Sequence, residues 1–260
     1  MAKFAANLSM MFNEVPFIQR FERAADAGFH GVEYLFPYEE SPQAIVEQLK
    51  KHDLTQVLFN MPAGHWAAGE RGMASIPGRE QEFQQGVHKA LEYALALNCK
   101  QVHAMAGKID SKFTPAQQQA CFIQNIQYAA DVMAEHGIKV LIEPINTRDM
   151  PGYFLTTQKQ AEALLPEINR NNVFIQLDLY HCQIMEGDLL KTIERLWRKF
   201  SHIQIASVPF RHEPDTGEVN YSWIFAKLDE MGYPGWLGCE YIPAGKTEDG
   251  LGWFKKLQTE

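Results

Sequence analysis

The stretch Gly-Ile-Lys-Val-Leu-Ile-Glu-Pro, residues 137–144, has the pattern of a strand that is buried on both faces. Its apolar residues follow a glycine and show no helical period, and fully buried strands of this kind belong to parallel sheets. An acid, Glu143, closes the strand directly before Pro144. The stretch therefore predicts a parallel sheet with a carboxylate at the carboxyl end of one strand.

Three other predicted strands also carry an oxygen-bearing side chain at or near their carboxyl ends. Asp178 closes Val-Phe-Ile-Gln-Leu-Asp, Gln204 lies in His-Ile-Gln-Ile-Ala, and Glu240 closes Trp-Leu-Gly-Cys-Glu. In a barrel of parallel strands the carboxyl ends meet at one mouth, where these side chains and Glu143 would converge. One such acid alone is as often a helix N-cap or a loop salt bridge. Four polar strand ends together indicate a metal site or an acid/base site.

The residue types in this set favour a hard divalent cation. Three carboxylates and one amide oxygen suit Mg²⁺ or Mn²⁺, whereas zinc prefers more nitrogen or sulfur ligands. Like charges that lie close together also repel strongly unless a cation offsets them. We therefore predict a magnesium or manganese site whose ligands are Glu143, Asp178, Gln204 and Glu240.

A pattern of a strand followed by a helix occurs eight times along the 260 residues. The predicted strands cover 3–10, 31–36, 54–61, 101–105, 138–143, 173–177, 202–206 and 236–240. The predicted helices cover 14–27, a segment that begins at Ser41-Pro42, 80–96, 114–136, 157–169, 188–200, 221–231 and 247–257. No linker divides the chain, so the simplest closure is one (β/α)8 TIM barrel domain over residues 1–260. A doubly wound open sheet is the alternative, although it would more often carry a glycine-rich nucleotide loop, which is absent from the sequence.

Composition narrows the class of protein. The hydrophobic content of 46% with 22% charged residues is that of a globular chain with a sizeable core. A formal net charge of −8 gives no long-range attraction to nucleic acid or to an anionic membrane. The four cysteines lie far apart, which indicates neither a disulfide framework nor a zinc knot. No targeting or membrane-spanning segment is apparent, so we expect a cytoplasmic protein.

Two predicted connections after strand ends, residues 61–79 and 207–220, are longer than usual and would lie on the catalytic face of a barrel. Arg71 and Arg211 are candidates for a bidentate contact with a substrate carboxylate, because an acidic protein must hold an anion locally. A structural role in the loop is nearly as well supported for each arginine. Trp66 and Glu70 of the first loop are further candidates for substrate binding, with packing as the alternative for Trp66.

His181 follows Asp178 in Asp-Leu-Tyr-His, and we expect it on the loop beyond that strand, where it could bind a substrate oxygen. A solvent-exposed histidine is the alternative. His103 lies within a predicted strand and is better interpreted as a core residue than as a ligand. Cys182 and Cys239 neighbour the proposed ligands, but strand alternation turns Cys239 away from Glu240, so a thiol nucleophile is not expected.

Several motifs are similar to those of one known family. They are Phe-Ala-Ala-Asn-Leu-Ser-Met at 4–10, Ala-Gly-Glu-Arg-Gly at 68–72, Ile-Pro-Gly-Arg-Glu at 76–80, Leu-Ile-Glu-Pro-Ile-Asn at 141–146, Arg-His-Glu-Pro-Asp-Thr-Gly-Glu-Val-Asn-Tyr at 211–221 and Gly-Cys-Glu-Tyr at 238–241. Through them the chain resembles, over essentially its full length, the hydroxypyruvate isomerase family of the xylose-isomerase-like TIM barrels. Residues 10–18 and 91–99 look closer to the 2-oxo-tetronate isomerase branch, whereas 68–72 and 143–146 look closer to hydroxypyruvate isomerase, so the branch stays open.

The resemblance implies a reaction and roles for the site residues. Glu143 and Glu240 correspond to the paired catalytic glutamates of the family, which with Asp178 and Gln204 also ligate its divalent metal. In related sugar epimerases a histidine commonly stands where Gln204 stands. The implied reaction converts hydroxypyruvate to tartronate semialdehyde, or 2-oxo-tetronate to 3-oxo-tetronate, through a metal-stabilised enediolate. Which glutamate is the base stays open.

Other functions remain as alternatives. An epimerase or dehydratase of a longer polyol would differ mainly in pocket size. A metal-dependent DNA-repair endonuclease is disfavoured by the net charge and by the small number of candidate histidine ligands. A barrel that binds a sugar acid without turnover is disfavoured by the complete acid set. We therefore expect a small anionic sugar acid as the partner, neither nucleic acid nor a membrane, and leave open whether the chain forms a homo-oligomer.

Overall fold

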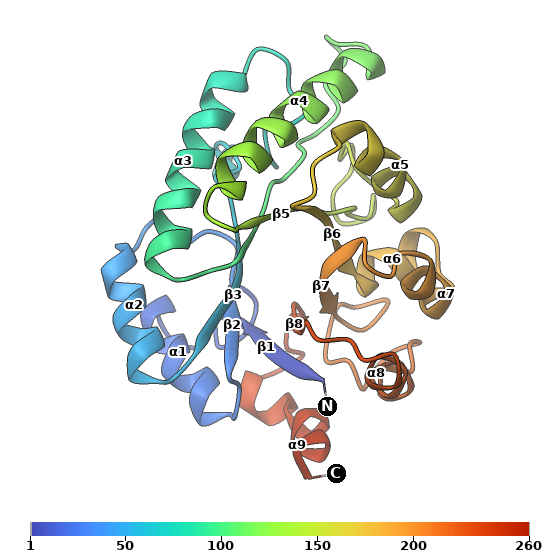
Figure 1. Cartoon of the computed structure of the whole chain (residues 1–260). Helices are drawn as coiled ribbons and strands as arrows, with labels where there is room; N and C mark the ends of the chain where they lie inside the picture. Colours follow the sequence, from blue (N-terminus) through green and yellow to red (C-terminus); the bar gives the residue numbers. More distant parts are fainter. Residues whose placement is uncertain (1, 260) are drawn as a thin grey trace. The chain divides into compact units, whose positions relative to one another are not determined.

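The computed structural model describes residues 2–259, and in it eight strands form a closed parallel barrel in the order β1-β2-β3-β4-β5-β6-β7-β8 (Figure 1). This order confirms the predicted (β/α)8 barrel and shows that the doubly wound alternative is wrong. The strands are β1 Lys3–Asn7, β2 Gly31–Glu33, β3 Thr55–Asn60, β4 Gln101–His103, β5 Lys139–Ile142, β6 Val173–Asp178, β7 Phe200–Ile205 and β8 Trp236–Cys239.

Helices separate successive strands. They are α1 Phe17–Asp26, α2 Pro42–Lys51, α3 Glu80–Ala96, α4 Pro115–Ala134, α5 Gln158–Ile168, α6 Leu179–Met185, α7 Leu189–Arg195, α8 Tyr221–Glu230 and α9 Gly252–Thr259, with 3₁₀ turns η1 Trp66–Ala68 and η2 Thr247–Gly250. The predicted helix over 80–96 has the bounds of α3, whereas the predicted helix over 188–200 is the shorter α7. Within residues 2–259, we find no helix with the length and apolar character needed to cross a membrane.

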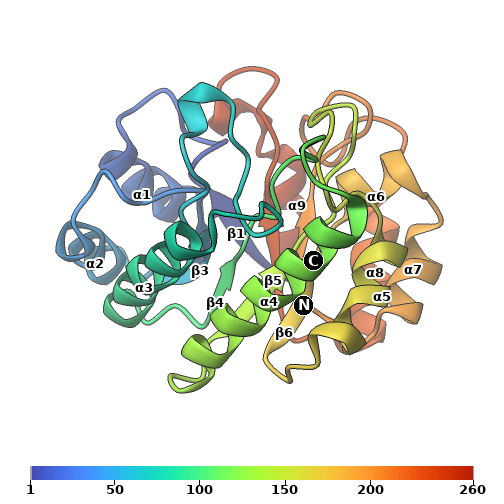
Figure 2. The same cartoon turned by 90° about the horizontal axis from the view of Figure 1, so that it is seen from above.

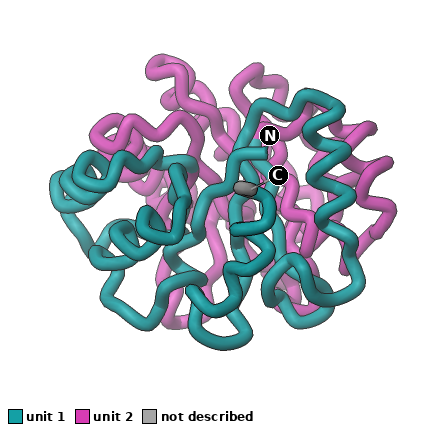
Figure 3. Tube along the Cα trace, turned by 90° about the horizontal axis from the view of Figure 1, so that it is seen from below, with its two compact units in different colours: residues 1–57, 202–260 teal, residues 58–201 magenta. Residues whose placement is uncertain are grey.

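The chain forms two compact units, residues 1–57 with 202–260 and residues 58–201 (Figure 3). In the first unit, α1 and α2 lie side by side, and β1 pairs with both β2 and β8 (Figures 1 and 2). An aromatic core fills this unit: Phe29 stacks on Phe254 with ring centroids 4.2 Å apart, and Phe4 meets Phe254 edge to face at 5.7 Å. Burial of these rings supplies much of the driving force that holds the strands of this unit together.

The second unit holds the stretch that decides the fold. Val140, Leu141 and Ile142 of β5 are fully buried, as the apolar run predicts, and α3 lies against α4 in the same unit (Figure 2). Thr114 caps α4, and its side chain accepts the Gln117 N–H in a capping box. Asn125, a residue of α4, donates a hydrogen bond from its side-chain Nδ2 to the Ala74 carbonyl oxygen at 2.9 Å. The long 61–79 loop is therefore anchored to a well-formed helix.

Candidate active site

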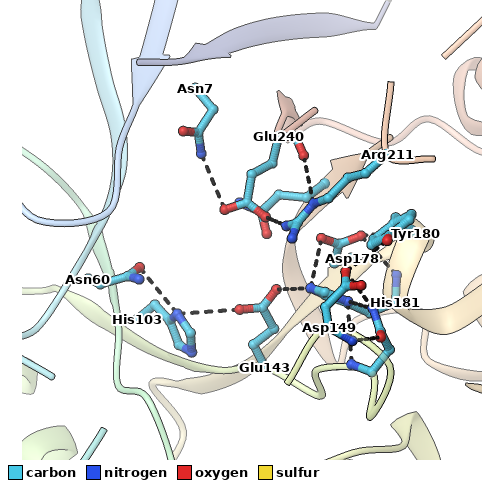
Figure 4. A network of polar contacts seen from close by, with 12 residues as sticks. Asn7, Asn60, His103, Glu143, Asp149, Asp178, Tyr180, His181, Arg211 and Glu240 are labelled. Carbon is cyan, nitrogen blue, oxygen red and sulfur yellow. Dashed lines mark hydrogen bonds and ion pairs between the residues drawn. The ribbon is translucent and has the colours of Figure 1, made fainter. Parts of the chain in front are cut away.

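Glu143 and Asp178 lie at the carboxyl ends of β5 and β6 in the unit of residues 58–201, and both are buried. His181 lies close to both acids: its Nε2 is 3.9 Å from Glu143 Oε1 and 3.6 Å from Asp178 Oδ2 (Figure 4). These distances are longer than a hydrogen bond, so the three groups face one another without bonding directly. Two strand-end carboxylates and one imidazole thus share a buried space.

Asp178 combines a structural role with its place in this cluster. Its Oδ1 accepts the backbone N–H groups of Tyr180 at 2.7 Å and His181 at 3.2 Å, which caps helix α6. The cap fixes the carboxylate, and Oδ2 is the oxygen that faces His181. Asp178 is therefore a helix N-cap, the alternative considered for a single strand-end acid. Its second oxygen, Oδ2, nevertheless still faces His181.

His181 was expected on a loop, and that expectation is wrong because helix α6 begins directly after β6. The residue is buried, with 4% of its surface exposed. Asn146 Nδ2 donates to His181 Nδ1 at 2.7 Å, which places the ring proton on Nε2, the nitrogen that faces the two acids. Asp149 holds Asn146 in turn and accepts the Tyr180 hydroxyl at 2.7 Å. The imidazole is thus fixed in both position and tautomer.

His103 is the last residue of β4, not a mid-strand residue, and it also lies against Glu143. Its Nδ1 is 3.2 Å from Asn60 Oδ1 and 3.5 Å from Glu143 Oε2 (Figure 4). Complete burial, with a smaller contribution from His181, lowers the pKa of His103 to about 3. The ring is therefore neutral and brings no positive charge to the buried acids. His103 is the core residue that the sequence predicted, but it belongs to the surroundings of the site.

In the other unit, Glu240 follows β8 and is buried. Arg211 Nη2 donates to Glu240 Oε2 at 2.7 Å, and Asn7 Nδ2 lies 3.4 Å from Glu240 Oε1, so both carboxylate oxygens are held (Figure 4). Arg211 has a φ of +59°, a left-handed conformation that is uncommon for this residue type. Its backbone is held there because its N–H donates to Ser207 O and its carbonyl accepts from Ile242 N. The loop thus delivers the guanidinium to the glutamate.

Glu33 is a buried acid of the same unit that the sequence analysis missed. It is the last residue of β2, and it accepts hydrogen bonds from Asn7 Nδ2 at 3.0 Å and Gln204 Nε2 at 2.8 Å. The predicted strand ran on to residue 36, which hid Glu33 in the middle of an apolar run. The signal that could have found it is an acidic residue inside an otherwise apolar run, since β2 contains only the three residues Gly31 to Glu33.

The 61–79 loop is built around two side-chain pairs. Glu70 makes a bidentate pair with Arg79, at 2.6 and 3.0 Å, and this contact is the largest cause of its lowered pKa. The Arg71 guanidinium lies 3.9 Å from the Trp66 ring centroid and donates to the carbonyl oxygens of residues 66 and 70. Trp66, Glu70 and Arg71 therefore lie together in the 61–79 loop, and the substrate-binding role expected of them stays a prediction.

In the unit of residues 58–201, the buried side chains of Glu143, Asp178 and His181 belong to a group that could hold a metal ion. The chemistry of the acids fits a divalent cation, because carboxylates are ligands of hard cations. Burial strengthens the case, since carboxylates transferred out of water need a compensating positive charge. The residues present thus fit the metal that the sequence predicts, and Glu143 and Asp178 are in the predicted ligand set.

The closed parallel barrel with acids at its strand ends is the class described as "Xylose isomerase-like TIM barrel", and that family matches residues 21–257. The chain is 50% identical to the 2-oxo-tetronate isomerase of Cupriavidus necator and 46% identical to the hydroxypyruvate isomerase of Escherichia coli, in each case over 98% of both chains. A crystal structure named AP endonuclease, family 2, from Brucella melitensis has a TM-score of 0.97 and 59% identity, covering 98% of this chain and 99% of that one. The chain therefore belongs to the hydroxypyruvate isomerase and 2-oxo-tetronate isomerase family of these barrels and is an isomerase.

Four free cysteines are buried, which bears on whether a thiol does the chemistry. Burial, followed by the charge of Glu186, raises the pKa of Cys182 to about 12. Burial, followed by the charge of Glu33, also raises the pKa of Cys239. A raised pKa leaves almost no thiolate near neutral pH, so neither sulfur is a competent nucleophile.

We predict that the native protein reacts slowly with a thiol reagent such as DTNB at about pH 8, because thiol reactivity follows thiolate content and access. Released thionitrobenzoate should amount to less than one equivalent in the first minutes. The same sample in concentrated guanidinium should release four equivalents, one for each cysteine. If the folded protein instead releases one full equivalent of thionitrobenzoate in the first minutes, and the labelled residue is Cys182 or Cys239, a thiolate is present at that cysteine.

Proposed function

We propose that this isomerase acts on a small 2-oxo acid, either 2-oxo-tetronate or hydroxypyruvate, and moves its carbonyl group to the neighbouring carbon. The observation that carries the proposal is the similarity over nearly the whole chain to isomerases of these two acids. The buried acids at the strand ends support it, because the reaction moves a proton between carbons and needs acid/base groups. The net redox change is zero, which agrees with a sequence that lacks a nucleotide-binding loop.

We infer that the metal site is formed by Glu143, Asp178, Gln204 and Glu240. The closed strand order supports this, since the carboxyl ends of parallel barrel strands share one mouth. The Gln204 amide donates its N–H to Glu33, so its oxygen is the end left to act as a ligand. Mg²⁺ or Mn²⁺ is the proposed ion, because most of these ligands are carboxylates or an amide.

A bound divalent cation would withdraw electron density from the carbonyl and hydroxyl oxygens of the substrate and make the proton on carbon more acidic. The residues of the chain then move that proton. One of Glu143 and Glu240 takes it from C3, and the same or the other glutamate returns a proton to C2. The hydroxyl proton passes from the C3 oxygen to the C2 oxygen, so the carbonyl ends at C3 and every atom is accounted for.

Other side chains are proposed to hold and orient the acid. His181 has its Nε2–H directed at the acids, where it can donate to a substrate oxygen, since Asn146 fixes the opposite nitrogen. Arg71 or Arg211 binds the substrate carboxylate, because a chain with a net charge of −8 must supply a local cation. Trp66 and Glu70 support this binding, Trp66 by stacking on Arg71 and Glu70 by fixing the loop through Arg79.

A substrate panel tests the proposed function. Purified protein with added Mg²⁺ or Mn²⁺ should convert 2-oxo-tetronate or hydroxypyruvate to a product whose carbonyl lies at C3, as read from the carbon NMR spectrum. A neutral ketose should react more slowly, because it lacks the carboxylate that the arginine would bind. The panel includes a DNA duplex with an abasic site, because the similar Brucella structure carries an endonuclease name. Cleavage of that DNA without turnover of either acid would overturn the proposal.

We predict that Glu143→Gln and Glu240→Gln each retain metal but lose turnover by about 10²–10⁴, the usual contribution of general acid/base catalysis. The amide keeps an oxygen that can still ligate, but it cannot accept the substrate proton. Metal content is measured on the same samples by manganese EPR. Glu213→Gln is the control, since the buried Glu213 carboxylate accepts the Ala244 N–H of a loop and is not among the proposed ligands or bases. Near-normal turnover in both variants at full metal occupancy would remove these glutamates from the chemistry.

A further inference from the structure

We infer that Glu33 is a positioning residue that makes Gln204 present its amide oxygen, and not its nitrogen, as a metal ligand. The inference rests on the metal site proposed above, in which Gln204 takes part. It adds a residue that lies outside the proposed ligand set and is not one of the proposed catalytic glutamates. All residues that carry it belong to the unit of residues 1–57 and 202–260.

Glu33 accepts hydrogen bonds on both of its oxygens. Oε1 receives Asn7 Nδ2 at 3.0 Å and Gln204 Nε2 at 2.8 Å, while Oε2 lies 2.6 Å from His202 Nε2. Glu33 has 1% of its surface exposed and His202 has 0%, so water does not compete for these contacts. Hydrogen bonds to an ionised carboxylate are shorter and stronger than those between neutral groups. The Glu33 carboxylate therefore cannot rotate without breaking several of them.

The polarity of these bonds selects one end of the Gln204 amide. The two ends of a glutamine amide are nearly equal in size, but the nitrogen only donates and the oxygen only accepts. A carboxylate only accepts, so its contact at 2.8 Å must be with the NH₂ group. The amide oxygen then lies on the other side of the amide carbon. The NH₂ group has no lone pair to offer a cation, so the choice made by Glu33 decides whether Gln204 can be a ligand.

His202 secures the carboxylate from the side opposite Gln204. Its Nδ1 is buried and makes no hydrogen bond among the residues that the structure describes. A buried N–H without a partner costs more than a bare acceptor, so the proton belongs on Nε2, the nitrogen beside Glu33. His202 is thus a third N–H donor to Glu33. Three donors on one carboxyl group explain why it acts purely as an acceptor.

Strand β8 leaves room for this carboxylate. Gly238 pairs in register with Gln204 on one side and with Ala5 on the other. A Cβ atom on Gly238 would lie 2.3 Å from Glu33 Oε2 and 2.5 Å from Glu33 Cδ, closer than real contacts allow. The glycine is therefore needed for space at this position. Gly238 also lies two residues before Glu240, a second proposed ligand. Asn7 Nδ2 is 3.4 Å from Glu240 Oε1 and 3.0 Å from Glu33 Oε1, so Glu33 and Glu240 share the Asn7 amide.

Manganese affinity tests the inference without relying on turnover. Glu33→Gln keeps the shape of the side chain but introduces an NH₂ group among three donors, so Gln204 should turn its oxygen toward residue 33. Loss of such a supporting residue usually weakens metal binding by about 10- to 100-fold. Free Mn²⁺ is measured by EPR titration of the full chain. Glu213→Gln should bind like the wild type, and circular dichroism melts should show that both variants fold.

A double variant separates positioning from general damage. Gln204→Ala removes the proposed ligand and should itself weaken Mn²⁺ binding. If Glu33 acts through Gln204, then adding Glu33→Gln to Gln204→Ala should change the affinity by less than about threefold, because the effects of coupled residues do not add. Full additivity of the two losses would overturn the inference, as would an unchanged affinity in Glu33→Gln alone.

A second variant tests the position of the Glu33 carboxylate while leaving residue 33 a glutamate. Gly238→Ala puts a methyl group against the Glu33 carboxylate, so a folded protein should lose Mn²⁺ affinity to a similar extent. Wild-type affinity in a folded Gly238→Ala protein would contradict the inference, and so would a wild-type protein that binds no Mn²⁺. If the wild-type protein binds Mn²⁺ with an affinity that depends on Glu33 and Gln204 but converts neither acid, the proposed function would be overturned and the role of Glu33 would stand.

Discussion

Burial of carboxylates at the ends of parallel strands is the constraint on which this structure depends. Moving one ionised carboxylate out of water costs several kcal/mol even after the protein relaxes, so each one must be compensated. The unit of residues 1–57 and 202–260 compensates Glu240 with Arg211 and Asn7, and Glu33 with three N–H donors. At about 1.5–3 kcal/mol each, three donors can offset that cost.

In the unit of residues 58–201, the buried carboxylates are stabilised by a helix N-terminus and by imidazole rings. Helix α6 begins at Asp178, so backbone N–H groups and the helix dipole stabilise that carboxylate. Glu143 lies beside the imidazoles of His103 and His181 at 3.5 and 3.9 Å, and His103 is neutral. These contacts orient the glutamate but add little charge. A carboxylate in such surroundings is well suited both to bind a cation and to accept a proton, which are the two roles proposed for it.

The sequence was sufficient to predict the barrel and the strand-end acids, because both depend on local patterns. The run of buried residues before Glu143 indicates a strand without reference to the rest of the chain, and eight repeats of strand and helix favour the closed barrel that the structure shows. The surroundings of the acids could not be predicted in this way. Asn146 reaches His181 across 35 residues and Gln204 reaches Glu33 across 171, and no spacing rule links such pairs. Helix α6 was missed because seven residues are too few to show a helical period.

The most direct test of the central claim, proton transfer between neighbouring carbons, is isomerisation in deuterated water followed by NMR. A glutamate that holds the migrating proton exchanges it with solvent, and a reversible reaction passes each molecule through the site many times. Solvent deuterium should therefore accumulate at C2 of the product, well beyond the level in a sample without enzyme. Product that carries only unlabelled hydrogen at C2 after the reaction has reached equilibrium would contradict the account and indicate direct hydride transfer between the carbons.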